Sequence, residues 1–217
     1  MPYAMNFYRD QISPDGATSA PLPATHRAIY VRHGSAVIDG RKMGRDEAAY
    51  FDAPVTLQTA GEWCELWRWD LALPNIPPLL HQGTGVLSSL RMSRVIASLP
   101  MAEGSHWLFR LDQVASTAGR VSDPHQPRPG IRCLMEGTFN INQNSESVRD
   151  VMPGDAWWES GAEPVIAWGS QQMATVFMRA MVAPPEQEGK PTGNWLKLGT
   201  AQTPGNWKLF VDRVIKV

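Results

Sequence analysis

Apolar residues in this chain gather in short runs, separated by polar segments that contain Pro and Gly. The first firm run, 28–31, is β-branched and aromatic and ends at the polar segment that begins with Arg32. A short apolar run bounded in this way is typical of a buried strand. Further strands are predicted over 85–87, 107–109, 164–168, 195–198 and 207–214.

Other runs follow the spacing of a helix. Thr59 and Glu62 are spaced as a capping box, and apolar residues then recur at helical intervals until prolines end the pattern. A second helix is expected over 91–99, because Pro100 would stop it. Ser170 can cap a third helix. The apolar positions of that helix, spaced for one helical face, are Met173, Val176, Phe177, Ala180 and Met181.

Strands that alternate with helices predict an α/β fold. We expect a three-layer α/β/α sandwich with a mostly parallel central sheet, in which ligands bind beyond the carboxyl ends of the strands. A single domain is predicted over 26–217, with an irregular insertion at about 100–132 and no apparent internal repeat. Residues 1–25, rich in Pro, Ser and Ala, are expected to form an extension that wraps the domain or is partly disordered.

Composition narrows the class of protein. The chain has 217 residues, of which 43% are apolar, so a globular domain with one sizeable core is expected. The 20 Lys and Arg residues nearly balance the 21 Asp and Glu residues, which argues against nucleic-acid or anionic-membrane binding driven by bulk charge. No signal peptide and no long apolar stretch is found, so a cytoplasmic protein is predicted. Cys64 and Cys133 are expected to be reduced and packed as small hydrophobes.

The polar segment after the first strand holds the most reactive side chain. His33 lies between Arg32 and Gly34, and an imidazole can act as a nucleophile or general base near neutral pH. The guanidinium beside it can clamp a phosphate, and glycine lets a ligand approach the backbone closely. The same residues also fit a solvated turn that happens to contain a histidine.

Segment 30–35, which contains these residues, resembles the signature of the histidine phosphatase (phosphoglycerate-mutase-like) superfamily. Segments 52–61, 86–96 and 134–139 resemble, in the same order, later segments of that superfamily. The superfamily's second histidine, which follows a late buried strand, has no counterpart here, and Ser170 stands at that place.

The resemblance implies a phosphomonoester hydrolase that acts on a small phosphorylated metabolite through a phosphohistidine intermediate. It implies His33 as the nucleophile and Glu136 as the general acid. The implied phosphate-binding residues are Arg32, Gly34, Arg94 and Ser170, with Arg91 as an alternative for Arg94. A hydroxyl at position 170 can donate to a phosphate oxygen but brings no positive charge, so turnover is expected to be slow.

Two other functions remain open at this point. One is an impaired family member that serves as a phosphate- or anion-binding or regulatory module, and the other is a related site that supports a different reaction. No metal is implied, because no His or acidic cluster has metal-ligand spacing, and no cofactor is expected. The expected partner is a small phosphate ester or other anion, without nucleic acid or membrane, and the sequence leaves homo-oligomerisation open.

Overall fold

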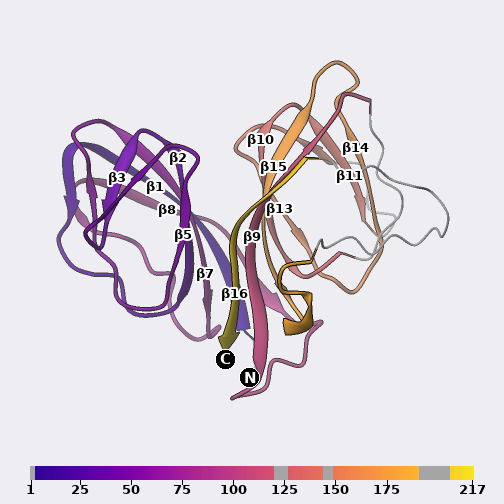
Figure 1. The fold of residues 1–217 in the computed structure, drawn as a ribbon, viewed down its shortest axis with the longest axis horizontal. Coiled ribbons are helices and arrows are strands. Elements are labelled where there is room, and N and C mark those ends of the chain that lie inside the picture. The colour runs from indigo at the N-terminus through magenta and orange to yellow at the C-terminus, as the bar shows by residue number, and fades with distance from the viewer. Residues whose placement is uncertain (1–2, 120–126, 144–148, 191–205) are drawn as a thin grey trace. The chain divides into compact units, whose positions relative to one another are not determined.

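The computed structural model describes residues 3–119, 127–143, 149–190 and 206–217. These residues form β-strands and one short 3-10 helix, with no α-helix among them. The prediction of a three-layer α/β/α sandwich is therefore wrong, and the fold is all-β. The chain divides into two compact units, Met1–Val95 (unit 1) and Ile96–Val217 (unit 2), which are described separately (Figure 1).

Unit 1 is an antiparallel sheet that curls towards a barrel. Its path runs β4-β3-β6-β1-β7-β2-β5, and β8 pairs with β1. Residues 3–18, which the sequence assigned to an extension, form the long strand β1 at the centre of this sheet. The strands are β1 (Tyr3–Thr18), β2 (His26–His33), β3 (Ser35–Ile38), β4 (Arg41–Gly44), β5 (Ala48–Phe51), β6 (Leu57–Thr59), β7 (Cys64–Ala72) and β8 (Gly83–Ile96).

Unit 2 contains a five-stranded sheet of order β13-β10-β15-β9-β16 and a three-stranded sheet of order β12-β11-β14. Part of the segment predicted to be an irregular insertion is the eleven-residue strand β9. The elements are β9 (His106–Ser116), β10 (Gly130–Glu136), β11 (Phe139–Gln143), β12 (Arg149–Val151), β13 (Ala156–Glu159), β14 (Val165–Gly169), the 3-10 helix η1 (Pro185–Gln187), β15 (Thr175–Ala183) and β16 (Asn206–Lys216).

The predicted helices fail for a physical reason that β7 makes clear. All nine residues of β7 are buried, so both faces of this strand are covered. A strand buried on both faces loses the alternation of apolar and polar residues that usually identifies it. The aromatic and aliphatic residues of β7 then fall by chance at helical spacing, as do the apolar residues of β15.

The two units share part of their strand order. The neighbours β1-β7-β2-β5 in unit 1 correspond to β9-β15-β10-β13 in unit 2. In both units a glycine follows the third strand of this set: Gly34 after β2, with φ of 68°, and Gly137 after β10, with φ of 82°. A repeated structural pattern is therefore present although the sequence shows no obvious repeat.

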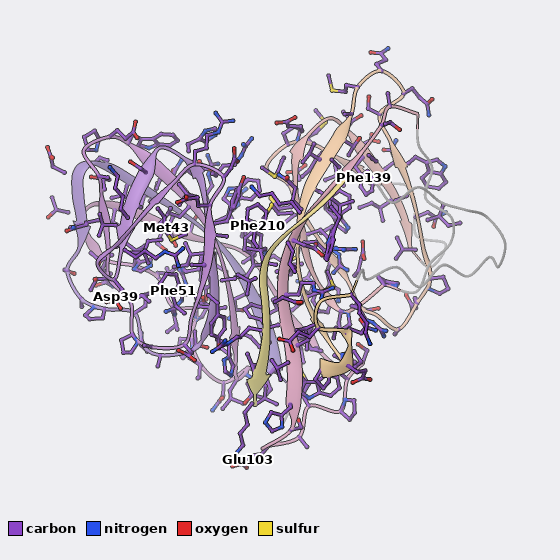
Figure 2. All side chains as sticks on the ribbon, viewed as in Figure 1. Asp39, Met43, Phe51, Glu103, Phe139 and Phe210 are labelled. Carbon is purple, nitrogen blue, oxygen red and sulfur yellow. The ribbon has the colours of Figure 1, made fainter. Side chains whose placement is uncertain are left out.

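Each unit has its own apolar core. Met43 is fully buried among the side chains of unit 1, and Phe139 lies within unit 2 (Figure 2). The core of unit 1 comprises Ile12, Leu22, Ile29, Val31, Ala36, Ile38, Met43, Ala49, Val55, Leu57, Cys64 and Leu66. The core of unit 2 comprises Leu134, Phe139, Ile141, Val151, Trp157, Val165 and Ala167, with Phe177 packed against them.

Candidate functional site

The residues predicted to form a phosphohistidine site are spread over several strands. Arg32 and His33 end β2 and are half-buried. The His33 ring stacks on Trp63, with ring centroids 5.8 Å apart, and the Arg32 guanidinium lies 5.6 Å from the centre of the Trp67 ring. Partial burial and the charge of Arg32 lower the pKa of His33. The imidazole is therefore neutral at pH 7 and rests against an indole.

Gly34 has a packing role. A Cβ at this position would lie 2.2 Å from the carbonyl oxygen of Trp63, and the positive φ disfavours other residues. The backbone that approaches Gly34 closely is thus part of the protein itself. This requirement explains why a glycine follows Arg32-His33 without reference to a ligand.

The other predicted residues lie elsewhere. Arg91 and Arg94 are exposed on β8, and the Arg94 guanidinium donates to the carbonyl of Ser93. Glu136 is exposed at the end of β10 in unit 2. Ser170 follows β14, and its hydroxyl accepts hydrogen bonds from the backbone N–H groups of Gln172 and Met173. Ser170 therefore closes a turn rather than capping a helix.

The interior of unit 1 contains a network of buried charges that has no counterpart among the predicted site residues. Arg68 on β7 donates from Nε to Asp10 at 2.8 Å and from Nη1 to Asp70 at 2.6 Å. Arg27 donates from Nε to Asp70 at 2.8 Å. The Ser88 hydroxyl also donates to Asp10. The four charged side chains are fully buried and formally balance, two positive against two negative.

This pairing sets the ionisation of the network. Burial alone would raise the pKa of Asp10, but the charge and hydrogen bonds of Arg68 outweigh burial and hold that pKa below its usual value. Conversely, the two carboxylates raise the pKa of Arg68 against the effect of burial. The Asp10 carboxylate and the Arg68 guanidinium are therefore both charged throughout the neutral range. The ion pairs of the network join strands β1, β2 and β7.

Unit 2 also contains buried ion pairs. Arg179 on β15 donates to both carboxylate oxygens of Asp112 at 2.8 Å, and the Trp207 indole donates to the same carboxylate at 2.8 Å. Arg110 makes a similar two-point contact with Asp212, at 2.7 and 2.9 Å. All of these carboxylates have several donors.

Arg132 on β10 is less completely hydrogen-bonded than Arg110 and Arg179. Its Nη2 donates to a Glu159 oxygen and to the carbonyl of Arg128, both at 2.8 Å. Its Nε and Nη1 atoms are buried and have no hydrogen-bond partner in the structure. Burial lowers the pKa of Arg132 to about 10, which Glu159 only partly opposes, and the charge of Arg179 lowers it further. Arg132 is thus a cation in the interior with two donor atoms unused.

An aromatic cluster lies on the same face of the sheet. Arg132 is directly opposite Trp157 in the β10–β13 pair, and Leu134, two residues on, is opposite Phe177 in the β10–β15 pair. Side chains two residues apart on a strand share a face. Trp157, Phe177 and Phe139 form a triangle with ring centroids 5.3–5.4 Å apart. The Trp157 indole also donates to Glu159 at 3.0 Å.

We define the Arg132 site as Arg132, Glu159, Trp157, Phe139 and Phe177. It combines a buried aromatic cluster with two unpartnered donor atoms on a buried cation, which an oxygen acceptor could satisfy. Sequence reasoning missed these residues because Arg132 lies inside an apolar run and Glu159 is distant in the chain. A usable signal was the alternation of charged residues in apolar strands, as in Arg68-Trp69-Asp70 and Arg110-Leu111-Asp112.

Within the described residues, no group of three or more His, Cys, Asp or Glu side chains is arranged to hold a metal ion. Cys64 and Cys133 are not joined by a disulfide, and each is buried in its own unit. In the same part of the chain, no helix has the length and apolar character needed to cross a membrane.

No family model and no curated protein matches the sequence. Solved structures do match. AerE from Microcystis aeruginosa superposes with a TM-score of 0.59 at 15% identity, covering 82% of this chain and 87% of AerE. A variant of oxalate decarboxylase from B. subtilis superposes with a TM-score of 0.56 at 12% identity, covering 81% of this chain and 68% of the decarboxylase. Salicylate 1,2-dioxygenase from Pseudaminobacter salicylatoxidans superposes with a TM-score of 0.53 at 9% identity, covering 82% of this chain and 71% of the dioxygenase.

These neighbours are cupin-fold proteins, so the class that the structure defines is the cupin fold. The resemblance to histidine phosphatases is therefore wrong, and with it the phosphohistidine mechanism. The alternatives that rested on it, a phosphate- or anion-binding or regulatory module and a related site with a different reaction, are unsupported as well. The Arg32-His33-Gly34 motif ends an antiparallel strand instead of leading from a parallel strand into a helix. A likeness at this level of identity establishes the fold and no particular activity.

Proposed function

We propose that this protein binds a small aromatic carboxylic acid at the Arg132 site of unit 2. The observation that carries the proposal is the pair of buried Arg132 atoms, Nε and Nη1, without hydrogen-bond partners. A buried donor left unpaired costs about 1–3 kcal/mol, and more when it is charged. A ligand that accepts these hydrogen bonds recovers that free energy.

A carboxylate fits the donors and an aromatic ring fits their surroundings. Arginine binds carboxylates through short charge-assisted hydrogen bonds. Glu159 already engages Nη2, so the ligand would use the remaining donor atoms. The rings of Trp157, Phe139 and Phe177 offer offset or edge contacts to an aromatic ring, worth about 0.5–1.5 kcal/mol per pair beyond burial. The site thus favours benzoate-like acids over acids of the same charge without a ring.

The structural neighbours support the ligand class. By their names, one of them acts on salicylate and another on oxalate, and both of these are small carboxylic acids. Salicylate carries an aromatic ring and oxalate does not. The aromatic cluster of unit 2 therefore makes salicylate or benzoate the expected ligand type in this chain.

Isothermal titration calorimetry with benzoate, salicylate and oxalate tests the proposal. We expect binding of the two aromatic acids, weaker binding of oxalate, and a loss of at least about tenfold in affinity for Arg132→Met, from the removal of a charged hydrogen bond. Arg94→Met, on exposed β8, is the matched control and should bind like the wild type. Circular dichroism establishes that each variant is folded. Absence of binding by the wild type, or equal affinity in Arg132→Met, would overturn the proposal.

A further inference from the structure

Unit 1 also contains a buried histidine, His81, in the connection between β7 and β8. Its side chain is fully buried, yet neither ring nitrogen has a hydrogen-bond partner. Buried polar atoms in proteins are almost always hydrogen-bonded, so an imidazole with two unpartnered nitrogens is unusual. His81 belongs to the connection between β7 and β8, residues 73–82, which we call the strap.

The groups around His81 come from three strands and do not favour a positive charge there. Asp10 on β1 is nearest, with its Oδ2 3.9 Å from His81 Nε2, but that carboxylate already accepts hydrogen bonds from Arg68 and Ser88. Arg68 on β7 and Arg27 on β2 both repel an imidazolium. The remaining titratable members of the network are Asp70, which is paired with both arginines, and Tyr8.

These surroundings keep His81 neutral while the strap is in place. Burial is the main cause, and the two arginines add to it, so that the pKa of His81 falls to about 3 although Asp10 acts in the opposite direction. An imidazole in water has a pKa of about 6.5. His81 therefore gains a proton far more readily when it is outside the unit than when it is inside.

The strap is held near its end by hydrogen bonds and by the packing of Leu79 against the core of unit 1. The Leu79 N–H donates to the Tyr8 hydroxyl at 3.0 Å, and Arg68 Nη2 donates to the Leu79 carbonyl at 2.8 Å. Near its end, the Gln82 carbonyl accepts from the Ser19 N–H at 2.7 Å. Residues 74–78 between β7 and these anchors are exposed. A segment with few buried contacts opens at a lower free energy than the surrounding strands.

We propose that the strap is an acid-opened latch, closed over the charged interior of unit 1 while His81 is neutral and released when His81 leaves its buried position and takes up a proton. The linkage has a definite sign. His81 has the lower pKa in the closed form. The free energy that favours the closed form over the open form is therefore fully present above about pH 6.5, and it is lost progressively as the pH falls from about 6.5 towards about 3. Between pH 7.5 and 5.5 the open population should rise about tenfold.

Hydrogen exchange of the strap amides, corrected for the intrinsic effect of pH on exchange, measures this population. In the wild type the protection of strap amides, that of Leu79 above all, should fall about tenfold from pH 7.5 to pH 5.5. In His81→Gln, which cannot be protonated, the protection should not change over this range. His106→Gln, at an exposed position of unit 2, and His33→Gln, whose histidine also has a lowered pKa, are the controls and should retain the wild-type response.

Two results would overturn the latch: a wild type whose strap protection does not change with pH, or a His81→Gln variant that keeps the tenfold change. NMR titration of the His81 ring in the wild type gives an answer that needs no variant to fold. The latch requires an apparent pKa clearly below 6.5 for this ring. An ordinary titration near 6.5 would show that His81 is not held in the buried, neutral state.

Discussion

Arg68 and Asp10 form a fully buried ion pair in unit 1, with Nε 2.8 Å from Oδ2. The two residues lie on neighbouring strands, β7 and β1. Arg179 and Asp112 on β15 and β9 form a matching pair in unit 2. Removing one partner of such a pair leaves an uncompensated charge in the interior, which is the costly event, whereas the intact pair contributes little net stability.

Asp10→Asn should therefore destabilise unit 1 by about 3–5 kcal/mol, because the buried network then holds two arginines and only one carboxylate, that of Asp70. Urea unfolding followed by circular dichroism measures the change. Arg45→Met, which breaks the exposed pair of Arg45 and Asp46 at 3.6 Å, is the matched control and should change stability by less than about 1 kcal/mol. Equal changes in the free energy of unfolding for the two variants would show that the buried pair contributes no more to stability than an exposed pair.

The acid stability of the protein should also depend on Asp10. Its folded pKa lies below the usual value, so its contribution is present above about pH 4 and is lost as the pH falls through the folded pKa. The wild type should lose stability steeply below pH 4 in thermal melts. Asp10→Asn should be less stable at neutral pH but lose less on acidification, and parallel curves for the two proteins would contradict this account.

Two glycines are expected to tolerate no side chain. A Cβ at Gly34 would lie 2.2 Å from the Trp63 carbonyl oxygen, and one at Gly137 would lie 2.6 Å from that of Ala174. Gly34→Ala and Gly137→Ala should each cost about 2 kcal/mol or more, from backbone strain and steric overlap together. Gly40 has φ of 78° and open space around it, so Gly40→Ala isolates the strain and should cost about 1 kcal/mol. Thermal melts that rank the three variants equally would contradict the packing role.

The two cysteines should be unreactive in the native protein. Both are buried, and burial raises the pKa of the Cys64 thiol to about 11, so little thiolate forms at pH 8. An aromatic disulfide reagent should label neither residue in native conditions and both in denaturant. Ser98→Cys, at an exposed position, provides a thiol that should react at once. Rapid labelling of the native wild type would be inconsistent with these burials.

Some of the structure could be predicted from the sequence. The apolar runs at 28–31 and 107–109 predict strands and lie within β2 and β9, and the run at 164–168 overlaps β14 from Val165 onwards. The predicted helices were wrong because the apolar residues of β7 and β15 also fall at helical spacing. Charged and apolar residues nevertheless alternate over Arg68-Trp69-Asp70, which is the pattern of a strand.

The site could not be predicted by the same means. The Arg32-His33-Gly34 motif suggested chemistry, whereas Gly34 serves the close approach of β2 to the backbone at Trp63. Arg132 and Glu159 are 27 positions apart and become partners only through the pairing of β10 with β13. A buried, incompletely paired arginine has no local sequence signature, since its burial depends on strands that are distant in the chain.

The central claim concerns the two unused donor atoms of Arg132. A crystal structure of the protein grown with benzoate tests it most directly. We predict a benzoate carboxylate oxygen within about 3 Å of Arg132 Nε or Nη1, with the ring against Trp157, Phe139 or Phe177. A structure in which these two atoms bind only water, or in which benzoate lies away from Arg132, would contradict the claim.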